Sequence, residues 1–229
     1  MERQKLNEIQ AVVFDLDGLM FDSERYVQKS WDLAGEAMGY GPLGHNIEHT
    51  LGLNVQNREK YFKKNYGEKF PFEKFLDTYR AAYQKLIKKE QVPVKKGLYE
   101  LLDLLKKYKI RRAVATSSSG QYVHSNLERV HISQSFDAVI TGDMVEHGKP
   151  APDIYEKACE QLQIHPSKAI ALEDAPNGIE SAYKAGLMPV MIPDLVRDTK
   201  KVDWMLAGTY DSLLDFARVL QEVFDGKEA

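Results

Sequence analysis

The sequence predicts an α/β protein: a Rossmann-like parallel sheet core that is interrupted by an inserted all-helical cap. Over most of the 229 residues, short apolar runs that end in polar residues alternate with helical stretches. This alternation favours a parallel sheet that is covered by helices on both faces. Between about Tyr26 and Val92, in contrast, the periodicity is helical and no second apolar run is typical of a buried strand.

The first strand is predicted at residues 11–14, where the apolar run Ala-Val-Val-Phe ends at a carboxylate, as expected of a buried parallel strand. A helix is predicted next, from Ser23 to Met38, with Ser23 as its N-cap. Further helices are predicted at 57–65 and 72–89. The aromatic stripe of the last helix is expected to form the core of the insert: Phe72, Phe75, Tyr79 and Tyr83.

The alternation of strands and helices resumes after Pro93. Strands are predicted at 113–116, 136–140, 169–172 and 190–192, and helices at 98–108, 121–130, 152–163, 177–185 and 211–224. We therefore expect residues 23–92 to form a helical cap, and residues 1–22 and 93–229 to form the α/β core that carries the chemistry.

Composition and charge exclude several classes of function. A net charge of −3 gives no general reason to expect binding to nucleic acid. No segment approaches the roughly 18–20 apolar residues that span a bilayer, and the polar first ten residues lack the apolar centre of a signal peptide. The single cysteine, Cys159, cannot form an internal disulfide, which suits a reducing compartment. We expect a cytoplasmic monomer that binds neither nucleic acid nor membrane.

Polar side chains follow each of the first predicted strands. In an open α/β sheet, ligands bind beyond the carboxyl ends of the strands. Five groups of residues are therefore expected to meet at one edge of the sheet: Asp15 and Asp17, the hydroxyl cluster Thr116–Ser119, Lys149 with its neighbours, Glu173, and Asp174.

These residue types suit phosphoryl transfer. The Asp15 carboxylate can attack phosphorus and form a covalent intermediate, which divides a difficult hydrolysis into two steps. Asp17, two residues further on, can protonate the leaving group and then accept a proton from water. Gly18 allows a close backbone approach directly after this pair of carboxylates.

The remaining groups suit a metal ion and a phosphate. Mg²⁺ prefers oxygen ligands and would neutralise both the nucleophile and the phosphoryl group. Asp15 and Asp174 are its natural side-chain ligands, and Glu173 is close enough in the sequence to join them. Lys149 and the Thr116 hydroxyl would hold the other phosphoryl oxygens by charge and hydrogen bonding.

Each motif taken alone also has an ordinary structural explanation. Thr116–Ser119 could be a strand-end turn, Lys149 a surface lysine, and Glu173 with Asp174 the cap of the following helix. Their joint occurrence, in a consistent order at successive strand ends, favours a functional site.

Four segments resemble the four motifs of the haloacid dehalogenase superfamily. They are DLDGLMFDSE at 15–24, VATS at 114–117, GKPAPD at 148–153 and LEDAPNG at 172–178. The helical insert after the first motif resembles the branch that contains β-phosphoglucomutase and small sugar-phosphate phosphatases. The resemblance covers essentially the whole chain, and its motifs are highly specific.

The resemblance implies a role for each matching residue. Asp15 is the nucleophile, and Asp17 is the acid/base that also gives its backbone carbonyl to Mg²⁺. Glu173 and Asp174 complete the metal site. The phosphoryl group is bound by Thr116 and Ser117 of the second motif and by Lys149 of the third. The expected activity is hydrolysis of a small phosphorylated metabolite, a sugar phosphate or a nucleoside monophosphate.

The branch itself divides between phosphatases and mutases. Mutases carry a histidine twelve positions after the nucleophile and a cap arginine three positions after a glycine, which grips the second phosphate of the substrate. The corresponding positions here are Val27 and, counted from Gly52, Val55, although Arg58 lies one helical turn away. Since valine offers neither charge nor a hydrogen-bond donor, we predict hydrolysis rather than isomerisation of the β-phosphoglucomutase type.

Two alternatives of another class are a receiver-like signalling domain and a non-catalytic phosphate-binding protein. A receiver domain would need only about half of this chain, and it would leave Asp17 and the helical insert without a purpose. A binding protein is disfavoured because no motif residue is missing. We also predict that the cap closes over the core through hinges at Phe21–Ser23 and Val92–Lys96, which would exclude water from the phosphate.

Overall fold

The computed structural model describes residues 6–50, 53–195 and 199–226. Its centre is a six-stranded parallel sheet in the order β3-β2-β1-β4-β5-β6. The strands are β1 Ala11–Phe14, β2 Arg111–Ala115, β3 Ala138–Ile140, β4 Ala169–Glu173, β5 Met188–Met191 and β6 Gly208–Thr209. The predicted α/β class is confirmed, and the first five strands lie within a few residues of their predicted positions. The two-residue edge strand β6 has no apolar run and was not predicted.

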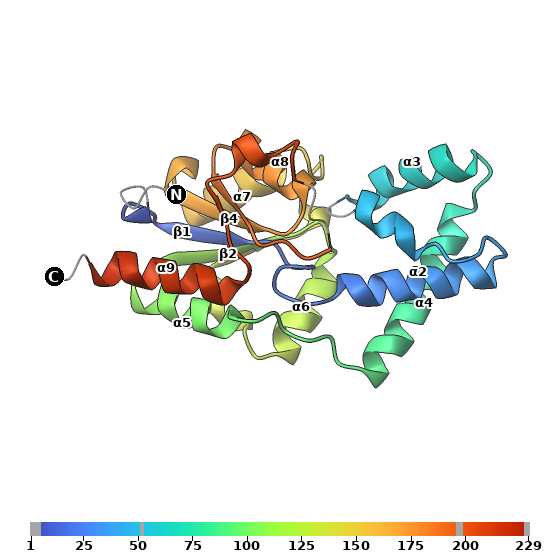
Figure 1. Ribbon diagram of the computed structural model, residues 1–229, viewed down its shortest axis with the longest axis horizontal. Helices are drawn as coiled ribbons and strands as arrows, with labels where there is room; N and C mark the ends of the chain where they lie inside the picture. Colours follow the sequence, from blue (N-terminus) through green and yellow to red (C-terminus); the bar gives the residue numbers. More distant parts are fainter. Residues whose placement is uncertain (1–5, 51–52, 196–198, 227–229) are drawn as a thin grey trace.

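Helices cover both faces of this sheet (Figure 1), and the alternating side chains of β1 show how. Val12 and Phe14 pack on one face, in the same cluster as the apolar residues of α5 Leu98–Lys107, α6 Gly120–Arg129 and α9 Leu213–Asp225. Ala11 and Val13 pack on the other face, against α7 Asp153–Leu162 and α8 Pro176–Lys184. The centre of the sheet is therefore buried on both sides.

The helical insert extends from one end of the sheet (Figure 1). It consists of α2 Glu24–Ala37, the 3₁₀ turn η1 Gly44–His49, α3 Val55–Tyr66 and α4 Phe72–Lys89. No strand occurs among the described residues between Glu24 and Lys89. Trp31 is at the centre of its apolar core, with its ring 5.3 Å from Phe62, 5.5 Å from Phe75 and 5.9 Å from Tyr79.

One residue of the predicted aromatic stripe does not belong to this core. Tyr83 is buried, but its hydroxyl oxygen lies 2.8 Å from that of Tyr122 on the core helix α6. It follows Tyr79 by one helical turn, towards the end of α4 from which the chain returns to the core. Spacing alone could not show that the last turn of the stripe faces a different neighbour.

The chain crosses between core and insert twice, and the two crossings pair with each other. Phe21 forms an antiparallel bridge with Val94, and the Asp22 amide donates to the Pro93 carbonyl at 3.0 Å. The Lys95 ammonium also contacts Asp194 of the core at 2.9 Å. The insert is thus joined to the core by a short double-stranded connection.

The described residues contain no helix with both the length and the apolar composition that crossing a membrane requires. The helices at the surface of the core carry buried residues on one side and charged residues on the other, as in α5 and α9.

Candidate active site

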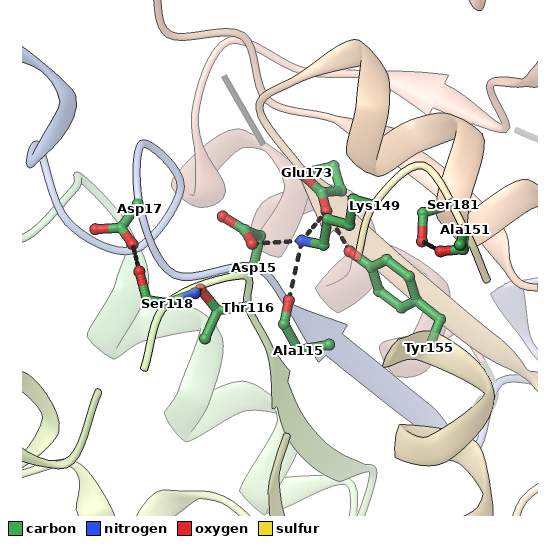
Figure 2. A network of polar contacts seen from close by, with 10 residues as sticks. All are labelled: Asp15, Asp17, Ala115, Thr116, Ser118, Lys149, Ala151, Tyr155, Glu173 and Ser181. Carbon is green, nitrogen blue, oxygen red and sulfur yellow. Dashed lines mark hydrogen bonds and ion pairs between the residues drawn. The ribbon is translucent and has the colours of Figure 1, made fainter. Parts of the chain in front are cut away.

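The carboxyl ends of three neighbouring strands bring the predicted site residues together. Asp15 follows β1, Thr116 follows β2, and Glu173 is the last residue of β4, with Asp174 next in the chain. Because β1 lies between β2 and β4, Asp15 is at the centre of the group. Lys149 reaches it from the loop that precedes α7 (Figure 2).

Lys149 binds two carboxylates of this group. Its ammonium donates to Asp15 Oδ1 at 2.5 Å, to Glu173 Oε1 at 2.6 Å and to the Ala115 carbonyl at 3.0 Å. Burial alone would lower the pKa of Lys149, but the charges of Asp15 and Glu173 outweigh this effect and raise the pKa. The side chain is only 1% exposed, so the surface-lysine explanation is wrong.

A buried acidic cluster surrounds the ammonium. Carboxylate oxygens of Asp15, Glu173 and Asp174 all lie within 4.8 Å of one another. Burial raises the pKa of Asp15 to about 8, against the opposing charge of Lys149. Burial, and then the charge of Asp15, raises the pKa of Asp174 well above its usual range. In both groups burial is the largest cause of the shift, and the neighbouring carboxylates add to it.

The cluster fits a divalent cation by charge and by ligand type. Three ionised carboxylates and one ammonium leave a net charge of about −2, and hard oxygen ligands are those that Mg²⁺ prefers. The Asp174 Oδ2 atom is buried without a hydrogen-bond partner. A buried polar atom normally has a partner, so this oxygen is suited to bind a cation. Gly18, at φ +81°, leaves room for this atom, because a Cβ there would lie 2.1 Å from it.

Asp17 faces a different set of neighbours. Its Oδ1 atom accepts hydrogen bonds from the Ser23 hydroxyl at 2.7 Å and from the Tyr122 hydroxyl at 3.0 Å. Its Oδ2 atom accepts one from the Ser118 hydroxyl at 2.6 Å (Figure 2). Ser23 occupies the predicted N-cap position of α2 but makes no side-chain cap bond, because its hydroxyl donates to Asp17 instead.

The hydroxyl cluster after β2 is divided between structural and site contacts. Thr116 is buried, and its Oγ1 atom accepts the Ser118 amide at 3.1 Å. Ser117 lies between them and is half-buried. The sequence singled out Thr116 and Ser117 but not Ser118, although all three belong to one run of hydroxyl residues.

Two further site contacts gave no sequence signal. The Tyr155 hydroxyl, on α7, donates to Glu173 Oε1 beside Lys149. Tyr122 reaches Asp17 from the first turn of α6. Both tyrosines lie in ordinary amphipathic helix patterns, and only the packing of those helices turns their hydroxyls towards the site.

The insert contributes the carboxyl group of Glu24 close to Asp17 and the guanidinium of Arg58 close to Glu24. Burial, and then the charge of Asp17, raises the pKa of Glu24 to about 8, while Arg58 opposes the shift. The Arg58 guanidinium lies over the Trp31 ring, 5.4 Å from its centroid, and donates to the Tyr79 hydroxyl at 3.2 Å. Val55, the first residue of α3, is 39% exposed, and Gly52 lies outside the described residues.

The chain is similar to known proteins both in sequence and in fold. Residues 12–192 match the family described as haloacid dehalogenase-like hydrolase. The phosphorylated carbohydrates phosphatase of Thermotoga maritima is 28% identical over 78% of this chain and 82% of its own length. CbbY of Rhodobacter sphaeroides, solved in complex with phosphate, is 25% identical, with a TM-score of 0.78 over 93% of this chain and 99% of that one.

A β-phosphoglucomutase from Clostridium difficile has the same fold. Its TM-score is 0.78 over 96% of this chain and 98% of its own, at 20% identity. Another similar protein, the fructose-1-phosphate phosphatase YqaB of Escherichia coli, is 28% identical over 77% of this chain and 93% of its own length. The chain therefore belongs to the haloacid dehalogenase-like hydrolases, shares its fold with β-phosphoglucomutase, and is a phosphoric monoester hydrolase.

Proposed function

We propose that the protein is a magnesium-dependent phosphatase that hydrolyses a small phosphorylated metabolite through an aspartyl-phosphate on Asp15. The observation that carries this proposal is the buried contact of Lys149 with Asp15 and Glu173, beside the unpartnered oxygen of Asp174. Burying a lysine among three carboxylates is costly, and apolar residues of similar size would fill the same space at a lower cost, so the arrangement points to a functional role. A site that must hold a dianionic phosphoryl group and a cation needs both signs of charge.

In the first step, an Asp15 carboxylate oxygen attacks phosphorus and the bond from phosphorus to the leaving oxygen breaks. Asp17 gives its proton to that oxygen, so the product leaves as an alcohol. In the second step, water attacks the aspartyl-phosphate and Asp17 takes the proton from the water. Inorganic phosphate departs, and the Asp15 carboxylate and the Asp17 proton are restored.

Lys149 places its charge directly beside the attacking oxygen of Asp15. We assign the phosphoryl oxygens to Lys149, which reaches Asp15 from the loop that precedes α7, and to Thr116 and Ser117, which follow β2. Asp15, Glu173, Asp174 and the backbone carbonyl of Asp17 would hold Mg²⁺. When bound, the ion supplies a Lewis acid that reduces the repulsion between the phosphate and the nucleophile.

The proposed substrate class rests on the relatives and on the helical insert. The similar protein from Thermotoga maritima is named for phosphorylated carbohydrates, and a sugar phosphate or a nucleoside monophosphate has the size that an insert beside the site can cover. We assign residues 23–92 to a cap and residues 1–22 and 93–229 to the catalytic core. The cap would exclude water and select the group that carries the phosphate.

The direct test is phosphate release from p-nitrophenyl phosphate and from a panel of sugar phosphates. Asp15→Asn should abolish turnover, since uncatalysed phosphate-monoester hydrolysis is among the slowest known reactions. Asp103→Asn, an exposed aspartate on α5, is the matched control and should retain full activity. A chelator should stop the wild-type enzyme, and added Mg²⁺ should restore it. Full activity of Asp15→Asn, or indifference to the chelator, would refute the proposal.

The mutase alternative has a separate test. Val27 is packed against the apolar core of the insert, so it offers no polar support to Asp17, in line with hydrolysis. The enzyme should be incubated with β-glucose 1-phosphate and a trace of the bisphosphate, and the products followed by phosphorus NMR. We expect inorganic phosphate; glucose 6-phosphate that forms faster would reverse the assignment.

A further inference from the structure

A chain of hydroxyl groups connects the helical insert to Asp17. The Tyr122 hydroxyl on α6 lies 3.0 Å from Asp17 Oδ1 and 2.8 Å from the hydroxyl of Tyr83 on α4. The two rings also touch, with centroids 6.2 Å apart. Tyr83 is 6% exposed and Tyr122 is half-buried, so the bond between the tyrosines is partly shielded from solvent.

The direction of this chain follows from proton counting. Tyr122 has one hydroxyl proton and donates it to Asp17, so its oxygen must accept the proton of Tyr83. The ordinary pKa of a tyrosine hydroxyl is about 10. Both hydroxyls therefore keep their protons at neutral pH, and the donation runs from Tyr83 to Tyr122 to Asp17.

The three donors to Asp17 come from three places in the fold. Ser23 lies at the first crossing and Ser118 in the loop after β2, whereas Tyr122 lies on α6. Among the partners of Asp17 in the described part of the chain, Tyr122 alone is in turn hydrogen-bonded to the last turns of α4. The orientation of the Asp17 carboxyl is therefore linked to the position of that helix.

We propose that Tyr122 is a positioning residue for Asp17, and that Tyr83 extends this positioning to the insert. The inference rests on the proposed role of Asp17 as the proton donor. A carboxyl that must deliver a proton to the leaving oxygen needs a defined orientation, and a small misplacement lowers the rate strongly. The Tyr83–Tyr122 bond makes that orientation depend on the placement of α4 over the core.

The test compares two substrates of nearly equal shape. Phenyl phosphate releases a phenol with a pKa of about 10, like that of tyrosine, and its departure needs a proton from Asp17. Nitrophenolate is a stabilised anion and leaves with little help. In Tyr122→Phe, kcat/KM should fall about tenfold for phenyl phosphate, a part of the 10²–10⁴-fold typical of acid–base catalysis. The loss for p-nitrophenyl phosphate should be less than about threefold, and KM should stay unchanged for both.

Tyr83→Phe should also lose more kcat/KM for phenyl phosphate than for p-nitrophenyl phosphate, but both losses should be smaller than in Tyr122→Phe. Because Tyr83 acts through Tyr122, the double variant should lose no more than Tyr122→Phe alone. Tyr108→Phe is the matched control: it removes the hydrogen bond from a tyrosine to Asp225 at the far end of α9, and it should leave both substrates unaffected. If a thermal melt shows that Tyr122→Phe is not folded, the difference between the two substrates in Tyr83→Phe tests the inference.

Equal losses for the two substrates would show a merely structural role and overturn the inference. Wild-type rates in Tyr122→Phe, or additive losses in the double variant, would do the same. These outcomes are separate from a failure of the proposed function. An active Asp15→Asn would remove the phosphatase mechanism, whereas an inactive Asp15→Asn beside a normal Tyr122→Phe would remove only the role of the tyrosines.

Discussion

Lys149 shows how much of the site depends on one buried charge. Its ammonium contacts both Asp15 and Glu173 and is almost fully enclosed. Without it, three carboxylates would face one another in a region of low dielectric, where like charges repel strongly. The lysine therefore stabilises the fold of the site and, under the proposed mechanism, also the charge that develops on the phosphoryl group.

Lys149→Met is expected to lower kcat by about 10²-fold or more, as the loss of one preorganised donor does in other enzymes. The melting temperature should also fall, because the carboxylates lose their counter-charge. Lys157→Met is the control, since this half-buried lysine on α7 donates to the Met144 carbonyl at 2.7 Å rather than to the acidic cluster. A turnover in Lys149→Met that matches the control would contradict the assignment of Lys149.

Cys159 offers a second test at the residue scale. The thiol is buried on α7, and burial raises its pKa to about 11. Because the thiolate is the reactive form, the folded protein should react with a disulfide reagent such as Ellman's reagent very slowly. The same reagent should titrate the thiol rapidly in denaturant. Rapid labelling of the folded protein would show that α7 opens or that the thiol is activated.

At the scale of elements, the paired crossings determine how the insert is attached. The backbone bond from Asp22 to Pro93 and the bond from the Lys95 amide to the Met20 carbonyl, at 2.9 Å, join the two connections. The side chain of Asp194 contacts both Arg25, at 3.5 Å, and Lys95. A movement of the insert must therefore pass through one compact hinge rather than through two independent linkers.

Hydrogen exchange tests whether this hinge responds to ligand. If the cap closes for each turnover, exchange at Phe21–Ser23 and Val92–Lys96 should slow when Mg²⁺ and orthovanadate, a mimic of the transferring phosphoryl group, are both present. The amides of α9, which lies on the core away from the insert (Figure 1), serve as the internal control and should not change. Unchanged protection at both crossings would count against a moving cap.

At the scale of the whole molecule, the acidic cluster links stability to pH. Burial raises the pKa of Asp15 from its usual 3.8 to about 8, so between these pH values the folded chain binds more protons than the unfolded chain. The free energy of unfolding of the metal-free protein therefore decreases as pH rises through this window. Protons and a cation compete for the same carboxylates, so the stabilisation by Mg²⁺ should grow as pH rises.

Thermal melts can measure this linkage without any substrate. The rise in melting temperature caused by millimolar Mg²⁺ should be larger at about pH 8 than at about pH 5, because protons occupy the carboxylates at the lower value. Asp174→Asn, which removes one of the three carboxylates of the cluster, should reduce the rise at the higher pH. An equal rise at both pH values would mean that the ion binds elsewhere.

The sequence by itself determined the α/β class, the insert and the residues from Asp15 to Asp174 that meet at the sheet edge. It could do so because an apolar run ends where a parallel strand ends, and the carboxyl ends of parallel strands share one edge. Periodicity likewise located α4, since a helix that buries one face must repeat its apolar residues.

Only the tertiary structure decided which neighbours those residues have. Lys149 is buried rather than exposed, the hydroxyl of the N-cap residue Ser23 donates to Asp17 rather than to an amide of α2, and Tyr83 faces Tyr122 rather than the core of the insert. The local spacing of residues in the sequence does not distinguish any of these contacts from its alternative. The contacts between Tyr83, Tyr122 and Asp17 depend on how α4 and α6 pack, and long-range packing is set by the shapes of both partners together.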